Sequence, residues 1–569
     1  MGPTTTEIVG SALRAAAEKA GEIMAAASPC ANTQSASHSY AFFTREGKMV
    51  AHGNGGLFLA GLLPLFVEAV LKLNPLHTIS PGDFIITNDP YTCGSSLPVI
   101  LGVSPVYYNK RPLALVASAC RYSDVGGSAP GGRPALARDI FQEGLRISPV
   151  RVFKKGIPNE GLFSLLSYNA RSGASLAKGI KAQFWAVQTA EKILSGLAGK
   201  YGFERLLRCM DGIIESSRRS VVSKLQTLPG GDLISSISAG EESGSGSQLI
   251  IKAAVKNSGD CLTVDFAGTS PQVTAPVNSS LGTTLSCVYA AVGAALPETP
   301  LNDGLFRSIR VNAPRDSLVN PSFPSPVSCS PTSAIMGAVY RCLTHLSTGA
   351  TPAWSGAKSY FTIGGFNNKK ESFYSFSSTI TGGEGAGVTR DGGRSVLSGL
   401  TVSPQASVEK LEIACPVMVS KICLVKDSGG AGAFRGGPAV EWSFTVLDNS
   451  PVISAGTGPA SPPEGQKGGL PGSPPLISVS SPDHLKCFSS AGIYTGSPGE
   501  KGEVTISTAG GGGFGPPRER DPDRVRKDVL EGLVSAEAAR DIYGVELAGV
   551  NLEVDVKATA YLRRELFRR

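Results

Sequence analysis

The chain has 569 residues, of which 41% are hydrophobic and 17% are charged. This composition is typical of a globular protein with several domains, and it excludes a disordered or fibrous chain. The 53 basic and 46 acidic residues give a formal net charge of +7, but the charges are scattered along the sequence. Because no basic patch is interleaved with aromatic residues, we expect no nucleic-acid interface.

The cysteines and the apolar segments indicate a cytoplasmic chain. The count of 11 cysteines is odd and includes no C-x-x-C pair, which is typical of reduced thiols in the cytosol. Residues 5–27 carry charges at helical spacing, so they lack the apolar run of a signal peptide. The most apolar segment, 57–71, is interrupted by Pro64 and Glu68 and is too short to span a bilayer. We therefore expect no membrane contact.

The first 230 residues are expected to form an α+β region. A helix ends near residue 27, a hairpin follows over 39–50, and buried strands are predicted within 83–106 and 113–120. Between 159 and 223 the apolar residues recur at helical spacing and predict three helices.

Beyond residue 230 the pattern changes twice. Residues 231–400 predict a central α+β region, and 401–515 predict a β-rich region of short strands separated by Gly, Pro and Ser. The last part, 516–569, predicts C-terminal helices and a tail, with Asp521 as the cap and Pro522 in the first turn. The fold class is therefore a multi-domain α+β protein of mixed helices and mostly antiparallel sheets.

Several familiar catalytic motifs are absent from the sequence. It contains no Walker A loop, no convincing dinucleotide-binding loop, no G-x-S-x-G and no H-E-x-x-H, and its five histidines lack metal-ligand spacing. We expect no cofactor bound by this chain. The glycine run 382–387 is predicted to be a tight turn, which is a commoner use of glycine than an anion-binding nest.

Three carboxylates in loop-like segments are the candidate catalytic residues: Asp89, Asp124 and Glu143. A carboxylate in such a loop can bind a cation or act as a base. The alternative is structural: Asp89 closes an Asx-turn, and Glu143 pairs with Arg146. Both interpretations stay open from the sequence.

The sequence blocks around these residues resemble the hydantoinase B/oxoprolinase family, in the family's order and spacing and over nearly the whole chain. The blocks are 88–91 (NDPY), 124–131 (DVGGSAPG), 140–150 (IFQEGLRISPV), 264–278, 300–307, 427–437 and 508–522. The family includes hydantoin utilisation protein B, N-methylhydantoinase B and the C-terminal half of 5-oxoprolinase.

The resemblance implies a subunit that works with a hydantoinase A-type ATPase, in an oligomer that opens cyclic amides such as hydantoins or 5-oxoproline, a compound of glutathione metabolism. ATP would then be bound by the partner. The site residues that it implies here are Asp124, Glu143, Arg146 and Asp89. Carboxylation of ketones is a third activity of the broader family.

The sequence departs from the family at its metal ligands. After the NDPY turn, the family's pattern is x-Gly-Gly-Thr-His-x-Pro-Asp. In this sequence Ser96 stands at the His position and Val99 at the Asp position. Its His-His-x-Asp is here 121–124 (RYSD), so Asp124 is the only surviving candidate ligand. The acidic position upstream aligns near Ser37, and the family's Pro-x-His-x-Gly is 57–61 (LFLAG). One carboxylate does not hold a divalent metal, so we expect none.

Two hypotheses for the function remain. In the first, the chain supplies the pocket in which a cyclic amide is hydrolysed with ATP from the partner. In the second, it is a catalytically degenerate homologue that serves as a scaffold or regulatory partner after losing most metal ligands.

Overall fold

The computed structural model describes residues 3–27, 38–53, 56–241, 247–296, 298–328, 331–346, 352–355, 358–368, 371–393, 407–457, 462–481, 484–489 and 493–566. Within them, helices and several sheets alternate, and the strand pairs are antiparallel apart from β10 with β11. The predicted fold class is confirmed. No helix in these ranges is long and apolar enough to cross a membrane.

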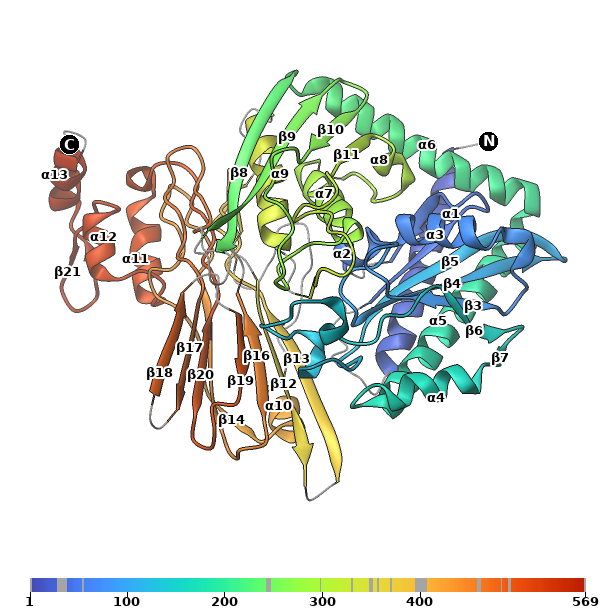
Figure 1. Ribbon diagram of the computed structural model, residues 1–569. Coiled ribbons are helices and arrows are strands. Elements are labelled where there is room, and N and C mark those ends of the chain that lie inside the picture. Colours follow the sequence, from blue (N-terminus) through green and yellow to red (C-terminus); the bar gives the residue numbers. More distant parts are fainter. Residues whose placement is uncertain are drawn as a thin grey trace.

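The N-terminal part is built on a seven-stranded sheet of order β2-β1-β5-β4-β3-β6-β7 (Figure 1). Its strands are β1 (His38–Phe43), β2 (Met49–His52), β3 (Phe84–Thr87), β4 (Val99–Tyr108), β5 (Arg111–Arg121), β6 (Val150–Lys154) and β7 (Ile157–Pro158). Both faces of the sheet are buried. Neighbouring residues of a strand point to opposite faces, so each strand contributes to two cores. Tyr40 and Phe42 pack with one core and Ala41 and Phe43 with the other.

Helices cover both faces of this sheet. One face packs against α1 (Pro3–Ala27), α4 (Glu160–Tyr168), α5 (Gly173–Tyr201) and the start of α6 (Phe203–Thr227). The other packs against α2 (Leu57–Ala60) and α3 (Leu63–Leu73), and shares its core with the next sheet. That second sheet has the order β11-β10-β9-β8 and packs against α7, α8 and α9. Its elements are β8 (Gly231–Glu241), β9 (Gln248–Asn257), β10 (Leu262–Asp265), β11 (Ile309–Asn312), α7 (Leu281–Ala295), α8 (Asp303–Phe306) and α9 (Thr332–Leu346).

Two further sheets pack face to face around a third core that contains Phe361, Trp442 and Phe444. The first, β13-β12-β16-β19, contains β12 (Ser359–Asn367), β13 (Ser372–Ile380), β16 (Val452–Gly456) and β19 (Ile493–Gly496). The second, β14-β15-β20-β17-β18, contains β14 (Val417–Leu424), β15 (Val440–Val446), β17 (Leu476–Ser481), β18 (His484–Ser489) and β20 (Glu503–Ser507), with α10 (Val408–Ala414) beside β14. Their strands run side by side in Figure 1.

Four glycine-rich segments, 381–387, 428–437, 463–472 and 509–515, form what we call the glycine bundle. Backbone hydrogen bonds join the segments to one another: the amide of Gly511 donates to Gly437 (2.9 Å), that of Gly437 to Glu384 (2.7 Å) and that of Gly430 to Gly511 (2.8 Å). A Cβ on Gly511 would lie 2.0 Å from the carbonyl oxygen of Glu384. As at the axis of a collagen helix, only glycine fits this spacing.

The bundle corrects one prediction. Residues 382–387 contain no turn, and their glycines have no positive φ. They are glycines because neighbouring backbones approach too closely for a side chain. Glu384, between them, is buried and accepts two hydrogen bonds from Arg390 at 2.9 and 2.6 Å.

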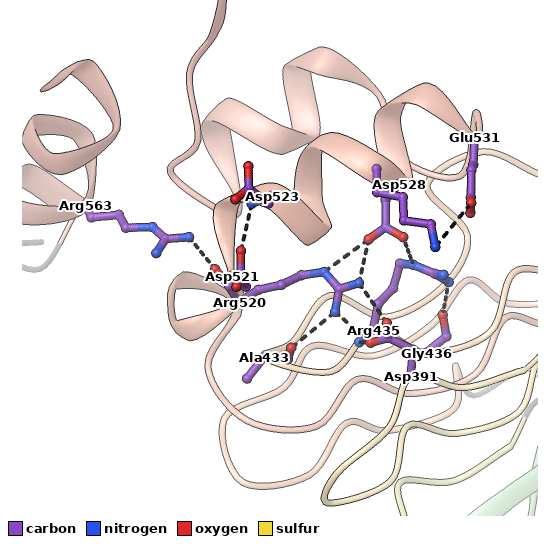
Figure 2. A network of polar contacts seen from close by, with 11 residues as sticks. Asp391, Ala433, Arg435, Gly436, Arg520, Asp521, Asp523, Asp528, Glu531 and Arg563 are labelled. Carbon is purple, nitrogen blue, oxygen red and sulfur yellow. Dashed lines mark hydrogen bonds and ion pairs between the residues drawn. The ribbon is translucent and has the colours of Figure 1, made fainter. Parts of the chain in front are cut away.

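The C-terminal elements lie at the far end of the molecule in Figure 1. They are α11 (Pro522–Leu530), α12 (Ala536–Asp541), β21 (Leu547–Ala548), β22 (Glu553–Val554) and α13 (Val556–Leu566). Figure 2 shows how buried charges join them to the glycine bundle. The guanidinium of Arg520 donates to Asp391 at 2.6 and 2.9 Å and to Asp528 at 2.7 and 3.1 Å. Nε of Arg435 lies 3.3 Å from Asp528, and Arg563 donates to the carbonyl of Arg520 at 2.6 Å.

Candidate functional site

Asn88 brings the candidate segments together at the end of β3. Its buried amide donates to the carbonyl oxygens of Leu97 (2.7 Å) and Leu145 (3.0 Å) and accepts from the amide of Ile147 (2.7 Å). The side chain therefore joins the turn 88–91 to the segment that carries Glu143 and Arg146. The sequence gives no sign of this role, because Leu145 and Ile147 are distant from Asn88 in the sequence.

Asp89, the first predicted site residue, closes the turn. Its Oδ1 accepts from the amide of Tyr91 at 3.1 Å, and its Oδ2 accepts from the hydroxyl of Thr92 at 2.9 Å. This is the Asx-turn arrangement that the sequence left open as an alternative.

Asp124 is buried behind the end of β5 and holds the glycine loop 124–132. Its carboxylate accepts from the amides of Gly126 (2.8 Å) and Gly131 (3.2 Å) and from the amide of Arg171 (3.1 Å). The Arg171 guanidinium donates to Asp124 at 3.2 Å and to the carbonyl of Gly127 at 2.7 Å. Arg171 is a partner that the sequence analysis missed, because it comes from the start of the helical segment.

Glu143 is fully buried and holds the loop 323–328. Its two oxygens accept from the amides of Val327 (3.0 Å) and Ser328 (2.8 Å). Burial raises the pKa of Glu143 to about 7, although both amide donors favour the charged form. Among the described ion pairs there is none between Glu143 and Arg146. The Arg146 guanidinium instead lies over the ring of Phe323, 4.6 Å from its centroid.

The raised pKa of Glu143 predicts a pH dependence of stability. The folded chain holds a proton that the unfolded chain releases between pH 4.5 and 7, so stability falls as the pH rises through this window. The shift corresponds to about 3 kcal/mol of unfolding free energy. We expect Glu143→Gln to reduce this slope to the part that Glu191 contributes, because burial also raises the pKa of Glu191 to about 7; the slope is measured as the difference in melting temperature between pH 5 and pH 8.

The matched control is Glu160→Gln, which removes an exposed carboxylate from the start of α4. It should keep the slope of the unsubstituted protein. A Glu143→Gln protein whose melting temperature still changes with pH by the full amount would show that other groups cause the dependence.

A second group of side chains, which the sequence analysis did not assemble, lies beside the glycine loop. We call Arg121, Arg133 and Lys358 the basic cluster. Arg121 ends β5, Arg133 follows Gly132 at the other end of the loop held by Asp124, and Lys358 precedes β12. Burial, with Arg133 adding to the effect, lowers the pKa of Arg121 to about 9. Burial also lowers the pKa of Lys358 to about 8, and the charges of both arginines act in the same direction.

The residues at this position do not fit a divalent metal. Asp124 already accepts three amide donors and a guanidinium, and Arg121 places a cation three residues before it. In the part of the chain that the structure describes, no three His, Cys, Asp or Glu side chains are grouped to hold a metal ion. Ser37 lies outside the described residues. The catalytic roles of Asp89, Asp124, Glu143 and Arg146 stay a prediction, since their described contacts are ones that hold loops.

Comparisons with known proteins agree over the length of the chain. The sequence model of the hydantoinase B/oxoprolinase family matches residues 2–517. The caprolactamase beta chain of Pseudomonas jessenii is 31% identical over 501 residues, covering 84% of this chain and 85% of that one. The B-type component of a putative D-/L-hydantoinase from a Pseudomonas strain is 25% identical and covers 89% of this chain and 88% of its own.

Two solved structures share the fold. The crystal structure of the ATP-dependent caprolactamase from Pseudomonas jessenii has a TM-score of 0.85 at 26% identity, covering 99% of this chain and 100% of that chain. The nucleotide-free structure of an acetone carboxylase has a TM-score of 0.87 at 17% identity, covering 100% of this chain and 83% of that one, and this likeness shows the fold alone. From its sequence blocks, its family match and its fold, the chain belongs to the hydantoinase B/oxoprolinase family.

Proposed function

We propose that the chain is the hydantoinase B-type subunit of an ATP-dependent enzyme that hydrolyses a cyclic amide, and that the ATP is bound by a hydantoinase A-type partner. The observation that carries the proposal is the full-length similarity to a caprolactamase, in sequence and in fold. The lack of a Walker A loop in this sequence fits a division of labour between two chains. Free cysteines, mostly buried in the described part of the chain, support a place in the cytosol.

In this proposal the predicted acidic residues position the site and do not react with the substrate. Asp124 fixes the loop that carries Arg121 and Arg133 at its two ends, and Glu143 fixes the loop that faces Arg146. Hydrogen bonds that hold a loop cut the freedom of the groups at its ends, which lowers the cost of binding a charged substrate.

The test is reconstitution with a hydantoinase A-type ATPase. The two chains are co-expressed and co-purified, and ADP release is measured with caprolactam, 5-oxoproline and hydantoin. We expect ADP release that depends on one of these cyclic amides and on both chains, with one ring opened for each ATP hydrolysed. A reaction with a ketone and bicarbonate serves as a further arm for carboxylation.

The scaffold hypothesis is kept because a specific observation favours it: the family's ligand positions hold Ser96, Val99 and Arg121. If this hypothesis holds, the two chains co-purify but no cyclic amide changes the rate of ADP release. If the two chains do not associate at all, the hydantoinase A-type ATPase is not the partner, and both hypotheses are wrong on this point.

A further inference from the structure

The basic cluster is assembled from three segments that pack firmly against one another. Gly131 of the loop contacts Thr362 of β12 so closely that a Cβ on it would lie 2.5 Å from the threonine methyl carbon. The Arg133 guanidinium lies over the ring of Tyr360, 4.1 Å from its centroid. Nζ of Lys358 lies 5.7 Å from the centroid of Phe58 in α2. The aromatic rings thus support two of the three cations.

Among the described residues these cations have no acidic partner. In the described part of the chain, no carboxylate lies within ion-pair distance of any of the three, and no carboxylate offsets the lowered pKa values of Arg121 and Lys358. Taking a cation out of water without a partner is costly, and placing like charges together adds to the cost. Elsewhere the chain avoids this cost, since the buried Arg520 is paired with Asp391 and Asp528, and the buried Arg435 with Asp528.

The neighbouring thiol does not supply the missing negative charge. Cys287 of α7 is buried near Lys358, and burial raises the pKa of Cys287 to about 12, so the thiol is neutral at physiological pH. Among the described residues, the half-buried Arg121 and Arg133 at the two ends of the loop, and Lys358 near them, therefore have no counter-charge.

We propose that Arg121, Arg133 and Lys358 form a binding site for a small oxyanion, either a carboxylate or a phosphate group. Each guanidinium offers a planar pair of donors that matches two oxygens of such a group, and the lysine adds a point charge. A bound metal ion would attract the oxygens of such a group by its positive charge. The basic cluster supplies that positive charge with side chains instead. Anion binding by the chain alone does not depend on catalysis or on a second chain.

Binding is tested by isothermal titration of the full chain at low ionic strength, with inorganic phosphate in one arm and acetate in the other. We expect saturable binding of one anion per chain in at least one arm, and the arm that binds identifies the source. Arg121→Gln and Lys358→Met should each weaken this binding at least tenfold, and the double variant should show none.

The matched control is Arg138→Gln, which removes the same charge from an exposed position after the same glycine loop. It should change the affinity by less than twofold. Melting temperatures show whether the variants fold: without anion they should equal or exceed that of the unsubstituted chain, because a repelling charge is removed, and the rise produced by the bound anion should be lost. The proposal is overturned if neither anion binds, or if Arg138→Gln weakens binding as much as Arg121→Gln.

Discussion

A Gly511→Ala chain should fail to fold in its C-terminal half. The new Cβ would lie 2.0 Å from the carbonyl oxygen of Glu384, well inside van der Waals contact. Neither backbone can move away, because the amide of Gly511 donates to Gly437 and its carbonyl accepts from Gly430. We expect a loss above about 4 kcal/mol, at the extreme end of single substitutions. The measurements are soluble yield, melting temperature and resistance to limited proteolysis.

The matched control is Gly196→Ala, which makes the same chemical change at an exposed position of α5. A Cβ there would have no atom within 4 Å. Because alanine favours a helix over glycine, we expect a gain of about 1 kcal/mol. A Gly511→Ala protein that melts within a few degrees of the unsubstituted chain would show that the bundle is loosely packed.

Arg520→Ala should cost about 3–5 kcal/mol, as expected when one partner of a buried ion pair is removed. Arg520 is 1% exposed and donates to both Asp391 and Asp528. Without it, the one described cation left beside Asp528 would be the Arg435 guanidinium, whose Nε lies 3.3 Å away. The C-terminal helices would then separate from the glycine bundle, which is measured as a lower melting temperature and early proteolytic loss of residues after 515.

Two further variants sharpen this experiment. Arg540→Ala breaks an exposed pair with Glu546 in the same C-terminal part and should cost less than about 1 kcal/mol. The double variant Arg520→Ala with Asp528→Ala should recover part of the loss, because it removes the buried charge that the single variant leaves unpaired. A double variant as unstable as the sum of the two single ones would contradict the ion-pair explanation.

Local signals made much of the fold predictable. The helix at the C-terminal part begins at Pro522, and Asp521 caps it by accepting from the amide of Asp523, as its sequence predicts. The pairing of β12 with β16 was not predictable, because residues 359–367 and 452–456 are far apart in the sequence. The glycine bundle was missed for the same reason: a glycine run looks like a turn until its distant neighbours are known.

In the candidate site, too, contacts between residues close in the sequence were predictable and contacts between distant residues were not. The Asx-turn of Asp89 depends on its next three residues and was anticipated as an alternative. The partners of Glu143, Val327 and Ser328, come from a loop that no local pattern connects to it. Arg121 was visible only as a departure from the family pattern, and Lys358 carried no signal at all, because its importance arises from charges brought near it by folding.

The glycine bundle sets an order on how the chain can fold as it is synthesised. Its four segments are contributed by stretches that begin at residue 381 and end at 515, and each is hydrogen-bonded to others. The early segments therefore leave the ribosome long before their partners exist, whereas the N-terminal sheet is complete once residue 158 has emerged. Contacts between distant segments also form slowly. The N-terminal half can become compact while the other half waits, so a chain stalled before residue 515 would expose unpaired glycine backbone to proteases.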